Sequence, residues 1–251
     1  MLQIYVCGAG GVGKTTLIGK FLERCKLNGG YVVRKENKIV INIDTTTVIQ
    51  EVARRILSEH GITSSKQLND KNFMWKLQGW IIKQQMQEAF QNNKPVLIGD
   101  RSILDPMIHG LQMFKEKFDS SLYSSFMEEN EPPEDKDCDT FCRWLFLPFT
   151  ESEEDMKQIM TTISSYRNAL FVLVHPRPNQ VSCNQSDPLR YPMDVKELEE
   201  YTTIYQHVLN NLRIPFINMN TSDLQERLEQ FEDSLIQRCS GNVASQIDKN
   251  V

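Results

Sequence analysis

The sequence has no long apolar run and no excess of basic residues. None of its 251 residues lies in a window of the ~18 apolar residues that a membrane-spanning helix needs. Lys and Arg number 28 against 33 Asp and Glu, a formal net charge of −5, which argues against nucleic-acid binding as the main role. Residues 1–8 lack the basic and apolar regions of a signal peptide. These absences favour a cytoplasmic protein with no membrane span and no nucleic-acid partner.

Cysteines are few, and their spacing forms no framework. The chain has 6 Cys, 12 Gly and 10 Pro, and a chain of this length folds without disulfides or a structural metal. Reduced thiols of this kind are expected to be small core side chains. Cys138 and Cys142 have the spacing of half a metal site. No second pair lies near them, which disfavours a metal there.

Apolar segments of two kinds alternate along the chain. Strands are expected at residues 2–7, 38–44, 96–99, 169–175 and 215–219. Helices are expected at residues 14–25, 49–57 and 73–90, after the capping box Asp194-x-x-Glu197, and after Ser222-x-x-Gln225. Strand–helix alternation predicts right-handed crossovers. The fold class is therefore α/β: a three-layer sandwich whose mostly parallel five-stranded sheet has helices on both faces.

One domain is expected over residues 1–251, because no repeat or low-complexity linker divides them. The alternation lapses at residues 115–167, where an acidic stretch with a Pro-Pro pair indicates a partly helical insertion. Four large apolar side chains cluster there: Trp144, Phe146, Leu147 and Phe149. Exposed, they would form a patch for a protein or lipid partner; buried, they would form a local core. Residues 240–251 are polar and are expected to be a flexible tail.

A glycine-rich phosphate loop stands between the first expected strand and the first expected helix. Residues 8–15 match G-x4-G-K-[ST] in the strand–loop–helix context that the motif requires. Glycines let consecutive N–H groups face phosphate oxygens, and the helix N-terminus adds partial positive charge. Lys14 can follow the β- and γ-phosphates, while the Thr15 hydroxyl can ligate Mg²⁺. Nucleotide contacts are expected from Gly8, Gly10, Gly11, Val12, Gly13, Lys14, Thr15 and Thr16.

Charged side chains follow two further strands. Asp100 ends a buried strand at the edge where open parallel sheets bind ligands, and it either orients Mg²⁺ or accepts a proton from a substrate hydroxyl. Arg101 can hold a substrate carboxylate or phosphate, and Asp105 faces the same crevice unless it is only a helix cap. Glu51 and Arg54 are spaced as an i, i+3 ion pair, for which a surface pair is the simpler interpretation.

The loop after the fourth strand contains a candidate for closing the site. A phosphotransferase needs positive charge over the transferring phosphoryl group and exclusion of water. Arg190 is favoured over Arg177 for this role because Asp187 can orient it; the alternative is a solvated loop arginine. Asn220-Thr221-Ser222, after the fifth strand, either contacts the base through its backbone or caps a helix.

The nucleotide is expected to be ATP, with GTP left open. No N-K-x-D motif follows the fourth or fifth strand, and no D-x-x-G motif follows the third. The absence of these guanine-reading and switch motifs disfavours a Ras-type GTPase.

Four motifs occur in a familiar order: Gly8-x4-Gly-Lys14-Thr15, Glu51-x2-Arg54, Asp100-Arg101-x3-Asp105 and Asp187-x2-Arg190. Together they resemble the P-loop AAA-type ATPase/kinase family typified by the nicotinamide-riboside kinase domain of a bacterial NAD-biosynthesis regulator. The Asp-Arg-Ser run is also similar to that of deoxynucleoside kinases. The resemblance spans most of the chain outside residues 115–167 and the tail, and the acidic insertion and Tyr191-Pro192 depart from it. It implies a five-stranded parallel sheet, Mg-nucleotide binding, a lid arginine at Arg190 and a site role for Glu51.

Two functions are compatible with these patterns. The first is an ATP-dependent phosphotransferase, a kinase for a small hydroxyl-bearing acceptor such as a nucleoside-like molecule. Lys14 and Arg190 would then stabilise the transferring phosphoryl group, with Asp100 as base or metal ligand. The alternative is a nucleotide-gated binding or regulatory protein that hydrolyses nucleotide slowly and meets a protein or lipid through residues 115–167.

Overall fold

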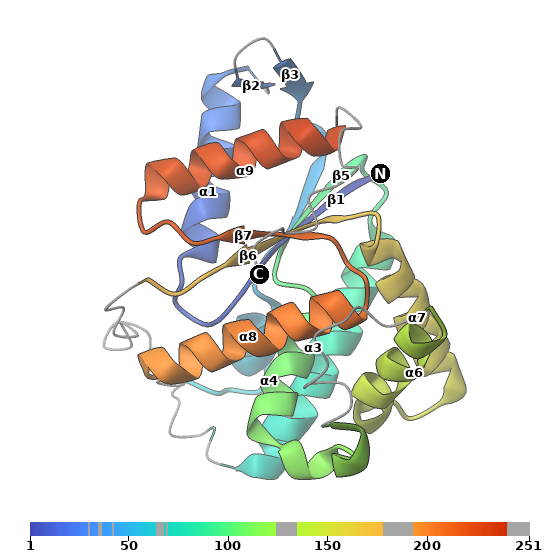
Figure 1. Ribbon diagram of the computed structural model, residues 1–251. Coiled ribbons are helices and arrows are strands. Elements are labelled where there is room, and N and C mark those ends of the chain that lie inside the picture. The colour runs from blue at the N-terminus through green and yellow to red at the C-terminus, as the bar shows by residue number, and fades with distance from the viewer. Residues whose placement is uncertain are drawn as a thin grey trace.

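The computed structural model describes residues 1–29, 31–34, 37–41, 43–63, 68, 70–123, 135–177 and 193–239 (Figure 1). Its elements in chain order are β1 (Leu2–Cys7), α1 (Lys14–Leu27), β2 (Tyr31–Arg34), β3 (Asn37–Val40), η1 (Ile43–Thr45), β4 (Thr46–Ile49), α2 (Val52–Glu59), α3 (Lys71–Gln91), β5 (Val96–Asp100), α4 (Leu104–Met113), η3 (Lys115–Lys117), α6 (Asp135–Phe146), η4 (Leu147–Phe149), α7 (Glu153–Tyr166), β6 (Leu170–Val174), α8 (Val195–Asn211), β7 (Phe216–Met219) and α9 (Leu224–Cys239).

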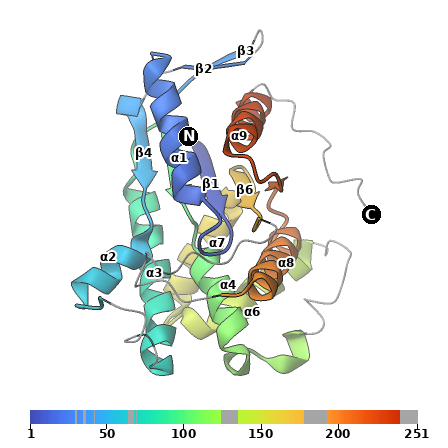
Figure 2. The same cartoon turned by 90° about the vertical axis from the view of Figure 1, so that its left-hand side faces the viewer.

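A parallel sheet of five strands lies at the centre of the molecule, in the order β4-β5-β1-β6-β7. Every residue of β5 and β6 is buried, as expected for strands covered on both faces. Helices α1 and α9 lie on one side of the sheet, and α3, α4 and α8 lie on the other (Figures 1 and 2). The predicted α/β sandwich with a five-stranded sheet is confirmed.

The second expected strand is wrong in its position. Of the residues expected there, 38–40 belong to β3, which pairs with β2 as an antiparallel hairpin outside the five-stranded sheet. The edge strand is instead β4, four consecutive β-branched residues that pair with β5, a composition that favours strands. Spacing alone predicts a helix that begins at Ile49, because apolar residues recur at Ile49 and Val52 with helical spacing. Both side chains are indeed buried. They belong to different elements, since α2 begins at Val52.

Two helix caps show how local chemistry sets the element boundaries. The predicted capping box of α8 is confirmed: the Asp194 carboxylate accepts from the Glu197 N–H, and the Glu197 carboxylate accepts from the Asp194 N–H, both at 2.8 Å. The cap of α9 is one residue later than expected. Asp223, and not Ser222, accepts from the Glu226 N–H at 2.8 Å. Its negative charge also favours the N-terminal end of the helix dipole.

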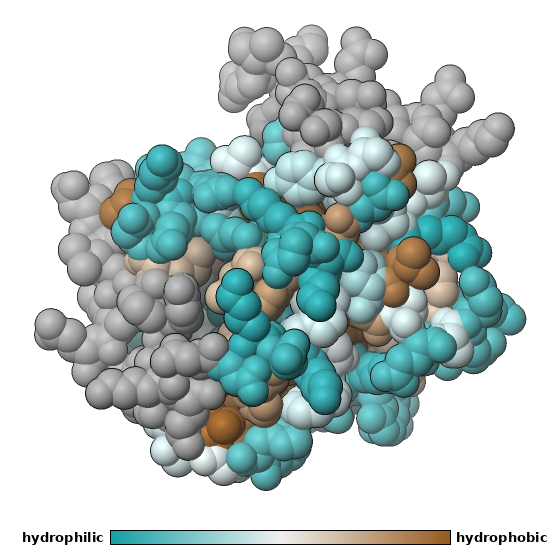
Figure 3. Space-filling model, turned by 90° about the horizontal axis from the view of Figure 1, so that it is seen from below, coloured by the Kyte–Doolittle hydropathy of each residue, from teal (hydrophilic) through white to brown (hydrophobic). Residues whose placement is uncertain are grey.

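The large apolar residues of the 115–167 segment are mostly buried. Trp144, Phe146 and Phe149 are at most 8% exposed, whereas Leu147 is 66% exposed. The Phe149 ring stacks on Trp75 of α3 with centroids 4.4 Å apart. On the face shown in Figure 3, hydrophobic residues form separate spots among hydrophilic ones. These three aromatic side chains therefore form part of the core and not an exposed patch.

The cysteines that were expected in the core are buried at four positions: Cys7, Cys25, Cys138 and Cys142. The Cys138 thiol donates to the Asn211 carbonyl at 3.0 Å. Cys239 is exposed, contrary to that expectation. Within the ranges that the structure describes, no three His, Cys, Asp or Glu side chains are grouped as a metal site, and no helix is long and apolar enough to cross a membrane.

Candidate functional site

The candidate residues meet at the carboxyl edge of the sheet. β1 lies between β5 and β6, so the chain leaves it at the point where the strand order reverses, the usual ligand site of open α/β sheets. The phosphate loop follows β1, Glu51 follows β4, and Asp100 ends β5. Parallel strands thus bring together segments that are far apart in the sequence.

The phosphate loop has the backbone that its glycines predict. Gly8, Gly11 and Gly13 have φ values of 128°, 84° and 97°, which lie in the region that glycine adopts readily. A Cβ at Gly8 would lie 2.5 Å from the Val174 carbonyl oxygen, so this position has no room for a side chain. The Lys14 ammonium folds back onto the loop and donates to the carbonyls of Gly8 at 2.8 Å and Ala9 at 2.6 Å.

Lys14 is buried, which changes its acidity. Removal from water, followed by the charge of Arg101, lowers the pKa of Lys14 to about 8, although Asp100, Asp105 and Glu51 act in the opposite direction. An anion arriving in the loop would favour the protonated amine. The protonated form of Lys14 is therefore only weakly favoured near neutral pH until a negative ligand binds.

Thr15 and Asp100 form a cluster of oxygen atoms beside the loop. The Thr15 hydroxyl donates to one Asp100 carboxylate oxygen through a short hydrogen bond. Asp100 is 3% exposed, and its other carboxylate oxygen has no hydrogen-bond partner among the described residues. A buried carboxylate oxygen left without a partner is unfavourable. Hard oxygen donors of this kind fit Mg²⁺, so Thr15 and Asp100 suit the cation that accompanies a nucleotide.

Arg101 has a strained backbone, and its side chain connects three parts of the site. Its φ of 85° is unusual for a residue other than glycine and costs roughly 1–3 kcal/mol. Its guanidinium donates to Glu51 at 3.2 Å, to Asp105 at 3.2 Å and to the Gly8 carbonyl at 3.4 Å. Burial would lower the pKa of Arg101, but Glu51 and Asp105 raise it overall, so this side chain stays charged.

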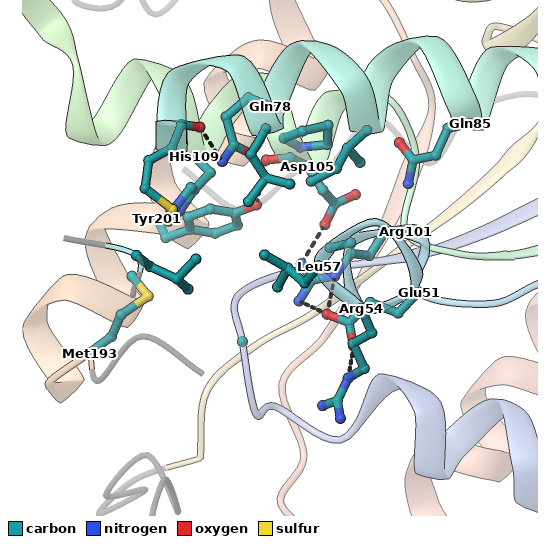
Figure 4. A pocket seen from close by; sticks show the side chains of 17 residues that line it. Glu51, Arg54, Leu57, Gln78, Gln85, Arg101, Asp105, His109, Met193 and Tyr201 are labelled. Carbon is teal, nitrogen blue, oxygen red and sulfur yellow. Dashed lines mark hydrogen bonds and ion pairs between the residues drawn. The ribbon is translucent and has the colours of Figure 1, made fainter. Parts of the chain in front are cut away.

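Glu51 lies at the N-cap of α2 and makes more than a surface pair. It accepts from Arg54 at 2.8 Å, as its spacing suggests, and also from Arg101 (Figure 4). Its side chain is 21% exposed. Burial would raise the pKa of Glu51, but Arg101 and then Arg54 outweigh it and lower the pKa to about 2. The Glu51 carboxylate is ionised throughout the neutral range.

Asp105 lies in the first turn of α4 and is 2% exposed. Its carboxylate accepts from Arg101, from the Ser102 N–H at 2.8 Å and from the Tyr205 hydroxyl at 2.9 Å. These contacts tie Arg101 to α4 and α8. The sequence alone assigns neither Ser102 nor Tyr205 a contact in the site, because nothing in the spacing of α8 links Tyr205 to a residue about 100 positions earlier.

Two cavities open at this edge of the sheet. One, of about 140 Å³, is lined by the phosphate loop, Thr15 and Asp100. The other, of about 160 Å³, lies among residues of α2, α3 and α4. Glu51 and Arg101 line both cavities. Their ion pair therefore stands where the two cavities meet.

The second cavity contains polar side chains that the sequence analysis missed. Gln85 is 4% exposed, and neither atom of its carboxamide has a partner among the described residues. Gln78, two turns earlier on α3, donates to the Met74 carbonyl at 3.2 Å (Figure 4). Burial, and then Arg101, lower the pKa of His109 to about 4, so its imidazole is neutral. The available signal was the spacing of Gln78 and Gln85, which continue the helical stripe of Met74, Leu77 and Ile81.

The structure describes only some of the remaining candidates. Arg190 and Asp187 lie outside the described residues. Arg177 follows β6 and is exposed. In the predicted base-contact segment, the Thr221 carbonyl accepts from Arg227, a buried arginine of α9. No sequence motif indicates Arg227 as a site residue.

Similarity to known proteins covers nearly the whole chain. The family model described as AAA domain matches residues 3–227. No curated protein matches the chain. Among solved structures, deoxyadenosine kinase from M. mycoides with the products dCMP and a flexible dCDP has 14% identity and a TM-score of 0.49, over 93% of this chain and 98% of that one.

Two further structures are similar at the same level. The same kinase with bound dATP has 16% identity and a TM-score of 0.45, over 94% of this chain and 99% of that one. Shikimate kinase from Acinetobacter baumannii in complex with shikimate has 11% identity and a TM-score of 0.45, over 98% and 96%. At these values the likenesses decide neither the reaction nor the acceptor.

Proposed function

Because the chain belongs to the AAA-domain family of P-loop proteins, we propose that it is an ATP-dependent phosphotransferase. The acceptor is a small, uncharged molecule with a hydroxyl group. ATP is preferred as the donor because the sequence lacks the N-K-x-D and D-x-x-G motifs.

One observation carries this proposal: a second cavity adjoins the phosphate cavity, and Glu51 and Arg101 line both. A protein that only hydrolyses nucleotide needs room for water beside the terminal phosphate. A kinase needs a separate acceptor site that opens onto it, so that the hydroxyl and the phosphoryl group are held in line.

The residues around the phosphate cavity have distinct parts in this reaction. Lys14 and Arg101 supply positive charge for the transferring group. Thr15 and Asp100 would hold Mg²⁺, which neutralises charge on the phosphate oxygens when it is bound. Asp100 is assigned to the metal because it bonds to Thr15 and is almost fully buried. Arg190, expected from the sequence as the lid arginine, remains part of the proposal.

Glu51 is then the residue that orients the acceptor hydroxyl. Its Oε1 accepts from Arg101 and its Oε2 accepts from Arg54, and a carboxylate has about four acceptor sites, so Glu51 can accept from a further donor. A pKa of about 2 makes Glu51 a weak base. Phosphoryl transfer tolerates this, because its loose transition state requires little proton removal before the leaving bond breaks. Glu51 accepts a hydrogen bond from the hydroxyl and takes the proton late.

The second cavity indicates the kind of acceptor. A cavity of about 150 Å³ holds a benzene ring, and this one is about 160 Å³. Its polar groups Gln78 and Gln85, which are buried, and His109, which is partly buried, are neutral. Its charged groups lie at the phosphate end: Glu51, Arg54, Arg101 and Asp105. A ring of nucleobase size with hydrogen-bonding groups fits this arrangement better than an acid does.

The test is transfer of labelled phosphate from Mg-ATP to a panel of nucleosides, simple sugars and hydroxy acids. Phosphorylation of a ring-bearing neutral acceptor is expected. Hydrolysis that is slow and independent of every acceptor would refute the proposal.

Gln85 provides a sharper version of that test. In Gln85→Leu, the KM of the preferred acceptor is expected to rise about tenfold, the effect of losing one hydrogen bond. Mg-ATP affinity should not change, and the protein should become no less stable, because an unpartnered buried amide is removed. Gln87→Leu, an exposed position on the same helix, is the control. If both variants behave alike, Gln85 does not contact the acceptor.

The gated binding protein is less well supported. Its motivation was the aromatic cluster in the 115–167 segment. Trp144, Phe146 and Phe149 are buried and are therefore unavailable to a partner.

A further inference from the structure

Arg227 connects the phosphate loop to two other segments. It lies in the first turn of α9 and is 1% exposed. Its Nη1 donates to the Val12 carbonyl at 2.6 Å, its Nε to the Thr221 carbonyl at 2.6 Å, and its Nη2 to the His175 carbonyl at 3.0 Å. Val12 belongs to the phosphate loop, His175 follows β6, and Thr221 follows β7.

Arg227 is a buried cation whose hydrogen-bond partners are uncharged. Every hydrogen bond that its guanidinium makes with the described residues goes to a backbone carbonyl. Burial, and then the charge of Arg177, lower the pKa of Arg227 to about 10, so it stays protonated at neutral pH. A buried cation is unfavourable unless hydrogen bonds or an anion compensate it. The phosphate loop beside it is where an anion is expected to bind.

The bond to Val12 has a direct geometric consequence. The Val12 carbonyl and the Gly13 N–H belong to one planar trans peptide, so they point in opposite directions. Arg227 draws the carbonyl toward α9, and this turns the Gly13 N–H toward the other side of the loop, where Gly13 lines the phosphate cavity. The Arg227 Nη1 would be 3.6 Å from a Cβ built at Gly13, so the guanidinium lies close to this residue.

We propose that Arg227 is a positioning residue of the nucleotide site. It holds the Val12–Gly13 peptide with its N–H toward the phosphates and ties the phosphate loop to the loop after β7. Its charge adds to the field that a phosphate meets in the loop. This inference rests on nucleotide binding by the proposed phosphotransferase but not on transfer to an acceptor.

Arg227→Met tests the proposal, with Arg24→Met as the matched control. Arg24 also ties α1 to α9, through Glu232 at 3.1 Å and Gln225 at 2.9 Å, but among the described residues its side-chain hydrogen bonds do not reach the phosphate loop. Calorimetry with Mg-ATP should show a dissociation constant raised about 10- to 100-fold in Arg227→Met, the effect of losing a charge-assisted hydrogen bond. Arg24→Met should bind as the wild type does.

Hydrogen exchange of the nucleotide-free protein provides a readout that needs no ligand. Amides of residues 8–16 should exchange faster in Arg227→Met and unchanged in Arg24→Met. Arg227→Lys keeps the charge but cannot reach all three carbonyls, so it should restore part of the affinity and little of the protection. If Arg227→Met does not fold, Arg227→Lys is compared with the wild type in its place.

The outcomes separate the two proposals. A folded Arg227 variant with wild-type affinity and wild-type exchange in residues 8–16 would mean that Arg227 only stabilises the fold. Failure to phosphorylate any acceptor would refute the phosphotransferase and leave Arg227 untouched, because neither readout here requires an acceptor.

Discussion

Raising the pH from 7 to 9 should weaken nucleotide binding, because it removes the proton from Lys14. With a pKa of about 8, Lys14 is roughly nine-tenths protonated at pH 7, half at pH 8 and one-tenth at pH 9. Only the ammonium form attracts phosphate, and bound phosphate raises the pKa of the amine. The dissociation constant should therefore rise about tenfold between pH 7 and pH 9.

The same reasoning fixes the number of protons exchanged on binding. At pH 8, each nucleotide should draw about half a proton from the buffer onto Lys14. The nucleotide contributes little at this pH, because a phosphate with a pKa of about 6 is already ionised. Calorimetry in HEPES and in Tris at pH 8 measures this uptake as a difference in heat, since the two buffers have different enthalpies of ionisation.

Lys14→Arg is the control for this experiment. A guanidinium keeps its charge over the whole range, so proton uptake and the change in affinity with pH should both disappear in any variant that still binds. Identical heats in the two buffers for the wild type, together with equal dissociation constants at pH 7 and pH 9, would refute the reasoning. The Lys14 pKa would then be close to its ordinary value.

Two further substitutions test the acceptor side and the lid. Glu51→Gln should lower acceptor-dependent turnover about 100-fold or more with little change in Mg-ATP affinity, as measured by steady-state kinetics and calorimetry; an equal loss of nucleotide affinity would contradict its role beside the acceptor. Arg190→Ala should lower turnover about 10²–10³-fold while weakening nucleotide binding much less. Wild-type turnover in that variant would assign Arg190 to a solvated loop.

The phosphate loop could be predicted because its determinants are local. The glycines, Lys14 and Thr15 lie within eight consecutive positions, and the positive φ values follow from having glycine there. The capping box at Asp194 is local in the same way. Strand–helix alternation was enough to predict the α/β class, since a parallel sheet requires a crossover between its strands.

Periodicity was less reliable where two elements meet. Periodicity shows that a side chain is buried but not which element it belongs to, so it predicts Ile49 in the helix although Ile49 ends β4. The sequence pattern places the cap of α9 one residue too early for a related reason, because Ser222 and Asp223 are both good capping residues.

Only the tertiary structure brings the rest of the site together. Glu51 and Arg101 are 50 positions apart, and Arg227 and Val12 are 215 apart. Their contacts depend on the order of the strands and on which helices cover each face. Neither can be predicted from the spacing of residues in the sequence. Gln85 has the spacing of a core residue; its unpartnered amide becomes visible only when the surfaces of α2, α3 and α4 are in place around it. The sequence by itself therefore determined the glycine-rich loop and its place between a strand and a helix, and the packing of the helices decided what lies next to it.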